Sequence, residues 1–227
     1  GYAGDISFSV GYTNDGEIVG ILVGEHSETP GLGARIEDEE YKEQFVGLKA
    51  DDIDVDGIAG ATVSSEAMLK GVQMTADVFT ELSWERQIAA LRHVLEDAVE
   101  FAALDVSEED ADAGIKAAFE AENRSGRVIG TIYEVSVGGY AAGNEGKPLV
   151  LFVGIDNRGN VLRVTVKSSG ETEGIGSNAL TEDYLAEFEG WSPNDDIKVD
   201  FVSGATITSR AVAEAVDIAR NAARGGE

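Results

Sequence analysis

Short runs rich in Val, Ile, Leu and Phe recur along the chain, and each run is bounded by Gly, Asn or Asp. Such runs predict β-strands, and the turn Asn14-Asp15-Gly16 between two of them predicts a tight antiparallel hairpin. The predicted strands cover residues 5–11, 17–24, 128–137, 148–155 and 160–167.

In other segments the apolar residues follow the spacing of a helix, as Val212, Val216 and Ala219 do, and Ser or Thr is available as a cap. The predicted helices cover residues 64–80, 84–103, 108–122 and 208–223. Strands followed by helices predict an α+β fold, in which antiparallel strands pack with helices.

Four landmarks occur twice along the chain in the same order. The matching segments are Gly1-Tyr2-Ala3 with Gly139-Tyr140-Ala141, Val10-Gly11-Tyr12 with Val153-Gly154-Ile155, Glu28-Thr29-Pro30-Gly31-Leu32-Gly33 with Glu171-Thr172-Glu173-Gly174-Ile175-Gly176, and Gly60-Ala61-Thr62 with Gly204-Ala205-Thr206. Glu171 lies 143 residues after Glu28, and Thr206 lies 144 residues after Thr62. This nearly constant spacing predicts two homologous domains, residues 1–83 and 84–227, and not a solenoid of shorter repeats.

The two halves differ in what precedes them. Residues 88–137, expected to be helical and then a strand, stand ahead of the second Gly-Tyr pair and have no counterpart ahead of Gly1. The first domain is therefore expected to lack its beginning, either through trimming or because another part of the chain supplies it. A start at Gly1 and not at Met also fits a processed chain.

Charge and composition narrow the classes of partner. The chain has 17 basic and 43 acidic residues among 227, a formal charge of −26 that repels phosphate backbones and anionic lipid head groups. Nucleic acid is therefore not an expected partner. Such acidity fits a salt-rich environment, an extracytoplasmic location or docking onto a basic redox partner.

The sequence lacks cysteine and lacks an apolar stretch of membrane-spanning length. The chain has no cysteine, which excludes disulfides, thiolate metal sites and iron–sulfur clusters within it. The longest apolar stretches, Ile18–Val23 and Leu149–Val153, are far shorter than the roughly 20 residues that span a bilayer. A membrane is expected to be involved only through an anchor outside this chain.

The two segments that end in Gly-Ala-Thr each lead directly into a predicted helix. A helix start offers unpaired backbone N–H groups and a positive dipole end, both of which stabilise a phosphate. Gly followed by Ala leaves the hydroxyls of Thr62 and Thr206 uncrowded. The alternative interpretation is a turn with an N-cap, because Ser and Thr are favoured there for hydrogen bonding alone.

Both halves resemble the FMN-binding domain of the G subunit of Rnf electron-transport complexes and of the C subunit of the sodium-pumping NADH:quinone reductase. The resemblance implies two FMN groups, each esterified through its phosphate to Thr62 or Thr206 by a separate magnesium-dependent flavin transferase that uses FAD. It further implies that a Glu-Thr-Pro-Gly-Leu-Gly stretch lies near the flavin ring. The residues implicated besides the two threonines are Gly60, Ala61, Ser203, Gly204, Ala205, Glu28, Thr29, Gly31, Leu32, Gly33, Glu171, Thr172, Gly174, Ile175 and Gly176.

Each half departs from the family pattern in a different place. Ala59 stands where the family has Ser or Thr, and Glu173 replaces the proline that Pro30 retains. Arg210, four residues after Thr206, is either a phosphate ligand or an ordinary solvated residue, and Glu66 holds the matching position in the first half. The resemblance therefore leaves the attachment at Thr62 less well supported than that at Thr206.

The resemblance implies an extracytoplasmic electron-transfer flavoprotein that exchanges electrons with redox partner proteins or small-molecule acceptors and is not a stand-alone enzyme. One alternative is the flavin-carrying portion of a larger reductase that acts on an organic acceptor. Another is a non-redox binding module in which the motif only caps helices. No metal site is expected, because the carboxylate runs at 37–40, 51–56 and 108–112 lack the ligand spacing of a calcium loop.

Overall fold

The computed structural model describes residues 1–141, 147–196 and 198–225. It contains two compact units, Gly1–Gln87 and Ile88–Glu227, here called unit 1 and unit 2. The domain limits predicted from the sequence, 1–83 and 84–227, place the boundary inside the long helix α2 (Thr62–Val94) and stay a prediction.

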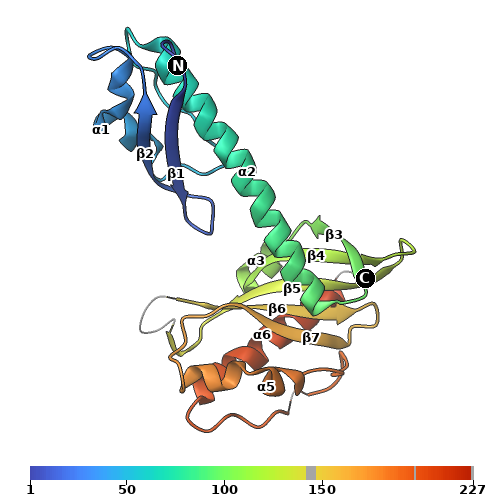
Figure 1. The fold of residues 1–227 in the computed structure, drawn as a ribbon. Coiled ribbons are helices and arrows are strands. Elements are labelled where there is room, and N and C mark those ends of the chain that lie inside the picture. Colours follow the sequence, from blue (N-terminus) through green and yellow to red (C-terminus); the bar gives the residue numbers. More distant parts are fainter. Residues whose placement is uncertain (142–146, 197, 226–227) are drawn as a thin grey trace. The chain divides into compact units, whose positions relative to one another are not determined.

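Unit 1 is a two-stranded antiparallel sheet packed against a helix (Figure 1). Strand β1 (Ile6–Tyr12) pairs with β2 (Ile18–His26) through a turn in which Gly16 has φ +78°. Three short helices follow, η1 (Gly33–Glu37), α1 (Glu39–Lys42) and η2 (Glu43–Phe45), and then α2. The core between these elements contains Ile18, Ile36, Tyr41, Phe45, Met68 and Val72.

Unit 2 contains a five-stranded antiparallel sheet in the order β3-β4-β5-β6-β7, so that each strand lies beside its neighbour in sequence. The strands are β3 (Ala98–Leu104), β4 (Ile115–Asn123), β5 (Val128–Val137), β6 (Leu149–Asp156) and β7 (Val161–Ser168). The helices are α3 (Glu108–Ala113), η3 (Gly176–Leu180), α5 (Glu182–Ala186) and α6 (Thr206–Gly225).

Both faces of the five-stranded sheet are covered. One face packs on α6, where the alternate residues Leu149, Leu151, Val153 and Ile155 of β6 are at most 1% exposed. The opposite face carries Phe152, which joins Leu91, Val94 and Phe101 in a second cluster. Strand β6 is therefore apolar on both sides, as its uninterrupted run of Leu, Val, Phe and Ile requires.

Two predicted helices are wrong over part of their length. The stretch predicted as helix 84–103 is the end of α2 as far as Val94 and then strand β3, and the stretch 108–122 is the short helix α3 and then strand β4. Gly114, at φ +119°, ends α3. Beyond it the Ala- and Glu-rich residues favour a helix locally, but pairing with β3 and β5 on either side outweighs that preference.

The other predicted elements and the tandem repeat are confirmed. Strands β6 and β7 repeat β1 and β2 with the same register, because Leu151 pairs with Val166 as Phe8 pairs with Val23. Helices η3, α5 and α6 repeat η1, α1 and the first part of α2. None of the helices in the described ranges combines the length and apolarity that crossing a bilayer demands.

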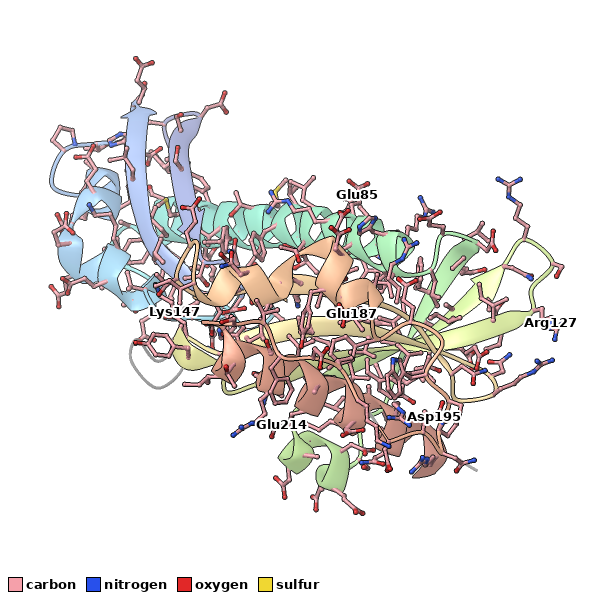
Figure 2. The ribbon with its side chains drawn as sticks, turned by 90° about the horizontal axis from the view of Figure 1, so that it is seen from below. Glu85, Arg127, Lys147, Glu187, Asp195 and Glu214 are labelled. Atoms are coloured by element: carbon pink, nitrogen blue, oxygen red, sulfur yellow. The ribbon has the colours of Figure 1, made fainter. Side chains whose placement is uncertain are left out.

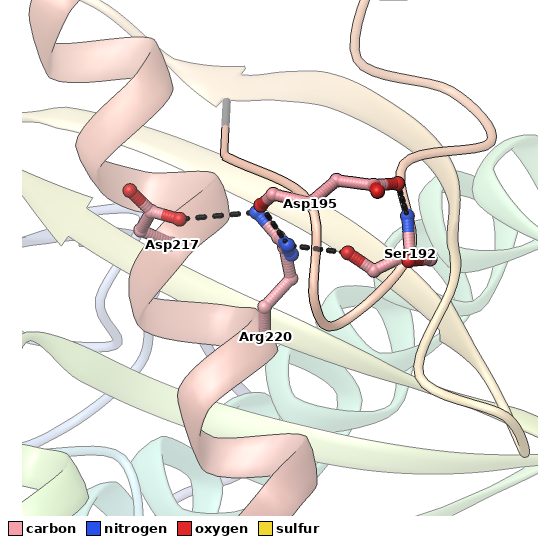
Figure 3. A network of polar contacts seen from close by, with 4 residues as sticks. All are labelled: Ser192, Asp195, Asp217 and Arg220. Carbon is pink, nitrogen blue, oxygen red and sulfur yellow. Dashed lines mark hydrogen bonds and ion pairs between the residues drawn. The ribbon is translucent and has the colours of Figure 1, made fainter. Parts of the chain in front are cut away.

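A buried arginine on α6, the last helix of unit 2, forms hydrogen bonds to the loop that contains Ser192 and Asp195. Arg220 on α6 is 2% exposed, and its guanidinium donates hydrogen bonds to the carbonyl oxygens of Ser192 and, at 2.7 Å, of Asp195. Asp217 one turn earlier accepts a third bond at 3.2 Å (Figure 3). The loop is thereby fixed to the helix by charge-assisted bonds.

The surface is acidic, as the composition requires. Figure 2 labels four exposed carboxylates on different elements, namely Glu85, Glu187, Asp195 and Glu214. No group of three or more His, Asp and Glu converges on a point that suits a metal ion anywhere in the part of the chain that the structure describes.

Candidate functional site

The two Gly-Ala-Thr motifs occupy the same place in both units. Thr62 is the first residue of α2, Thr206 is the first residue of α6, and both side chains are exposed. Gly60 and Gly204 both have φ +82°, a backbone conformation that favours glycine. This tight turn places the threonine at the helix end, where the first N–H groups have no intrahelical partner.

Two buried serines hold the turns in place. Ser65 is 1% exposed, and its Oγ accepts a hydrogen bond of 3.1 Å from the backbone N–H of Ile58. Ser209 accepts the matching bond of 3.0 Å from the N–H of Val202. Each serine follows its motif threonine by three residues, so the repeat in the sequence already marks the pair.

A glutamate lies under each threonine-bearing turn. The Glu28 side chain is 5% exposed and accepts hydrogen bonds from Ser64 Oγ and, at 2.9 Å, from the N–H of Ala3. In unit 2 Glu171 accepts from Thr208 Oγ1 at 2.7 Å and from the N–H of Ala141 at 3.1 Å. Each glutamate thus ties the helix start to the Gly-Tyr-Ala segment of its own unit.

These bonds affect the ionisation of the first glutamate. The hydrogen bond from Ser64 and that from the backbone of Ala3 hold the pKa of Glu28 below its ordinary value. The carboxylate is therefore charged at neutral pH and acts as an acceptor only. Its position below the helix start makes it a fixed structural anion of the site.

The loop after each glutamate folds in the same way twice. Gly31 has φ +73° and Gly174 has φ +75°. The carbonyl oxygen of Thr29 accepts from Leu32 N and Ala34 N, both at 3.1 Å, and Thr172 accepts from Ile175 N at 3.1 Å and Ser177 N at 3.2 Å. The loop directs one large apolar side chain, Leu32 or Ile175, into solvent.

Glycine is required directly after that apolar residue. A Cβ on Gly33 would lie 2.6 Å from Ser64 Oγ and still closer to the Glu28 carboxylate. A Cβ on Gly176 would lie 3.0 Å from Thr208 Oγ1 and would meet Glu171 in the same manner. The sequence motif therefore contains this glycine because the glutamate and the helix hydroxyl occupy the space of a side chain.

Exposed apolar side chains surround each threonine. In unit 1 Tyr2 is 77%, Leu32 52% and Val63 52% exposed. Their counterparts in unit 2 have exposed fractions of 46% for Tyr140, 53% for Ile175 and 55% for Ile207. In unit 1 these groups gather at one pocket and mark a candidate binding face, and the sequence repeat gives unit 2 exposed apolar residues at the equivalent positions.

A pocket of about 400 Å³ brings the predicted residues of unit 1 together. It lies within the range of roughly 300–1,000 Å³ that small-molecule sites occupy. Its lining consists of Tyr2, Glu28, Thr29, Leu32, Gly33, Gly60, Ala61, Thr62, Val63 and Ser64. The residues predicted from the motifs do not include Tyr2, Val63 and Ser64, and Gly31 shapes the loop without being among the lining residues.

Each unit also places an arginine near the turn, but from a different element. In unit 1 Arg35 of η1 donates to the carbonyl oxygen of Ala59 at 3.4 Å. In unit 2 Arg210 of α6 lies over the ring of Phe201, with its guanidinium carbon 5.9 Å from the ring centroid. Ser203 in the same turn is exposed.

His26 has a structural role at the edge of this site. Its Nδ1 accepts from the N–H of Glu28 at 3.1 Å, and its Nε2 lies 2.8 Å from Glu37 Oε1. In unit 2 Ser169 Oγ accepts the matching bond from the N–H of Glu171 at 3.0 Å. Because a serine replaces the histidine there, imidazole chemistry is not common to the two sites.

The chain matches one family model and is similar to several known proteins. A family model for the FMN-binding domain matches residues 1–77 and 144–221. The G subunit of the ion-translocating oxidoreductase complex of Stutzerimonas stutzeri is 30% identical over 166 residues, which cover 66% of this chain and 70% of that protein. The corresponding protein of Methanosarcina acetivorans is 40% identical over 85 residues, which cover 34% of this chain and 45% of that protein.

Further relatives are matched over a smaller share of their length. The G subunit of the Na(+)-translocating ferredoxin:NAD(+) oxidoreductase complex of Acetobacterium woodii is 33% identical over 96 residues, which cover 37% of this chain and 46% of that protein. The chain thus spans about half the length of several of its relatives. The crystal structure of NqrC from Shewanella oneidensis superposes with a TM-score of 0.40 at 22% identity, covering 58% of this chain and 74% of that one.

The two segments matched by the family model contain both threonine-bearing turns, both glutamates and most of the exposed apolar residues beside them. They cover more than half of the chain. The chain therefore belongs to the FMN-binding domain family and contains two such segments in tandem.

Proposed function

We propose that this protein is an electron-transfer flavoprotein that carries two FMN groups, one joined by a phosphoester bond to Thr62 and one to Thr206. FMN supplies one- and two-electron chemistry when it is bound. The observation that supports this proposal best is the pairing, in both units, of an exposed threonine at a helix start with an exposed apolar face.

The phosphate end of FMN fits the helix start. Unpaired N–H groups and the positive end of the helix dipole stabilise a phosphate there by roughly 0.3–1 kcal/mol per charge. The net charge of −26 opposes this gain, because an acidic protein repels a free phosphate. A covalent ester removes the need for that attraction, since it holds the phosphate in place whatever the surrounding charge.

The ring end of FMN fits the apolar face. In unit 1 the pocket beside Thr62 is bordered by the exposed side chains of Tyr2, Leu32 and Val63, which offer apolar contact to an aromatic ring system, and the flat ring of Tyr2 can stack on it. Glu28 does not face this ring as a free base, because both of its oxygens accept hydrogen bonds from the protein. The Glu28 carboxylate therefore acts in this site as an engaged acceptor that holds the turn.

Attachment requires access by a second enzyme. Both threonine side chains are exposed at the protein surface, which supports modification by a flavin transferase that uses FAD as the donor. Relatives are subunits of ion-translocating oxidoreductase complexes, which supports redox proteins as the exchange partners. We place the protein outside the cytoplasm, where a covalent tether prevents loss of the cofactor by dilution.

The test is intact-mass spectrometry of the chain produced with and without a flavin transferase. The native chain is expected to gain two FMN masses, and the Thr62→Ala and Thr206→Ala variants are each expected to gain one. Thr80→Ala is the matched control, because Thr80 is exposed on the same helix as Thr62 and bonds only to the carbonyl oxygen of Ala76. A chain that stays unmodified and colourless would support a non-redox binding module instead.

A further inference from the structure

Unit 1 lacks a layer that its repeat in unit 2 possesses. In unit 2, β6 pairs with β7 on one side and with β5 on the other. In unit 1 the repeated strand β1 pairs with β2, and no second partner strand is found for it within the described ranges (Figure 1). The segment that supplies β3, α3, β4 and β5 in unit 2 has no counterpart in unit 1.

The side chains of β1 show the consequence. In unit 2 the inward-facing Leu149, Leu151, Val153 and Ile155 are at most 1% exposed. Their counterparts on β1 are only partly buried, and these are Ile6, Phe8, Val10 and Tyr12. Equivalent positions of the repeated fold are thus fully buried in unit 2 and only partly buried in unit 1.

The helix behind the strand shows the same difference. Ile218 and Ala222 of α6 are partly buried against the core of unit 2, where α6 contacts β5 and α3. The matching residues of α2 are Met74 and Val78, and they are 61% and 55% exposed. Large apolar side chains that are exposed one turn apart on the same helix indicate an interaction surface.

The free edge of β1 is also unprotected against pairing. Natural edge strands commonly carry Lys, Pro or other charged residues that prevent another strand from adding to them. Between Ile6 and Tyr12 the chain has neither a charged residue nor a proline. The backbone N–H and C=O groups on this edge therefore form a template for a further antiparallel strand.

We propose that the open edge of β1, together with Met74 and Val78, is the docking site for a strand-bearing segment of the same type as residues 98–137. In unit 2 that segment stands directly before Gly139-Tyr140, the repeat of Gly1-Tyr2. By the register of β5 on β6, its last strand places residues equivalent to Val135 and Val137 opposite Phe8 and Ile6. The proposal does not depend on flavin attachment.

Docking of this segment has a consequence for the pocket. In unit 2, β5 ends at Val137, and Tyr140 follows within three residues and is 46% exposed. In unit 1 Tyr2 is 77% exposed. A copy of this segment joined to Gly1, as β5 is joined to Gly139, would hold Tyr2 against the rim of the pocket beside Thr62.

The test compares three chains. The first is the 227-residue chain, the second carries an added copy of residues 98–138 joined to Gly1, and the third carries the same copy with Val135→Pro in it. Proline removes a ladder hydrogen bond and is excluded from central strands. The third chain is therefore matched in length and composition but unable to pair along β1.

Two readouts report on the docking surface. Hydrogen exchange of the β1 amides reports strand pairing, and β6 in the same molecule serves as the reference. Peroxide oxidation reports the exposure of Met74, with Met68, which is 0% exposed, as the buried reference. In the second chain β1 exchange and Met74 oxidation are both expected to slow by at least roughly tenfold, and the third chain is expected to match the first.

Several results would overturn the proposal. If the second chain exchanges and oxidises like the first, the segment does not dock on β1. If the added copy prevents folding, a synthetic peptide of residues 127–138 is titrated onto the first chain, and the absence of protection of β1 there has the same meaning. A first chain that is already a dimer with protected β1 amides assigns the edge to a second copy of the chain and contradicts the proposal.

Discussion

Ser65→Ala tests how the turn that carries Thr62 is held. Ser65 is 1% exposed, its Oγ accepts from the N–H of Ile58 at 3.1 Å, and it donates to the carbonyl oxygen of Ala61 at 3.2 Å. Alanine leaves the N–H of Ile58 without a partner in a buried place. An unsatisfied buried donor costs about 1–3 kcal/mol, so unit 1 should lose stability of this order.

The loss can be measured for each unit separately. Pulse-labelling hydrogen exchange in urea follows the peptides of unit 1 and unit 2 in the same sample. With a urea slope of about 1–3 kcal/mol per molar, the midpoint of unit 1 is expected to fall by about 1 M while that of unit 2 stays unchanged. Ser209→Ala should produce the reverse result, because Ser209 bonds to Val202 in unit 2.

The matched control is again Thr80→Ala, because Thr80 is exposed and its hydroxyl donates to the carbonyl oxygen of Ala76 within the same helix. Exposed substitutions of this kind change stability by less than about 0.5 kcal/mol. If Ser65→Ala changes the midpoint of unit 1 no more than Thr80→Ala does, the serine does not hold the turn. The account of how Thr62 is positioned would then be wrong.

Three further outcomes are expected. Gly33→Ala should abolish FMN attachment at Thr62, because the added Cβ displaces Glu28 and Ser64. The control Gly20→Ala should leave the attachment intact, because its Cβ would meet nothing within 4 Å. Equal FMN masses on the two variants would contradict this reasoning. Arg220→Met should lower the free energy of unfolding of unit 2 by about 2–4 kcal/mol, because the carbonyl oxygens of Ser192 and Asp195 lose a charged donor. An unchanged urea midpoint of unit 2 would refute this prediction. Burial raises the pKa of Tyr41 from 10.0 to about 12, so the neutral form is favoured in the folded state. The raised pKa of Tyr41 contributes at most about 3 kcal/mol to the free energy of unfolding of unit 1; this contribution is complete below pH 10 and is lost between about pH 10 and 12. The urea midpoint of unit 1 should therefore decline over this pH range, and Tyr41→Phe should lack that decline.

The sequence predicted those parts of the fold whose signal is local. Strands such as 128–137 alternate or run as apolar blocks between turn residues, and the structure has β5 at Val128–Val137. The segments 98–104 and 115–123 became strands because of partners far away in sequence, and their Ala and Glu residues gave no local sign of it. Pairing between distant strands is the information that a single-sequence pattern lacks.

The sequence motifs indicate the glycines and threonines of the candidate site but not its supporting hydrogen bonds. Glu28 and Thr62 both belong to the predicted site, but nothing in their spacing indicates that Ser64 donates a hydrogen bond to the carboxylate of Glu28. A signal was present, because Ser64 and Thr208 both follow the motif threonine by two residues and both have a hydroxyl. The repeat therefore marks these two hydroxyls as an equivalent pair.

The central claim is that a hydroxyl at each helix start bears FMN. Tandem mass spectrometry of peptides from the chain, purified after production with a flavin transferase and digested under denaturing conditions, localises the modification directly. The account predicts one FMN on Thr62 and one on Thr206, with Thr29, Ser64, Thr172 and Thr208 unmodified. Peptides in which both Thr62 and Thr206 are bare, from a preparation in which a known flavin acceptor protein is fully modified, would contradict it.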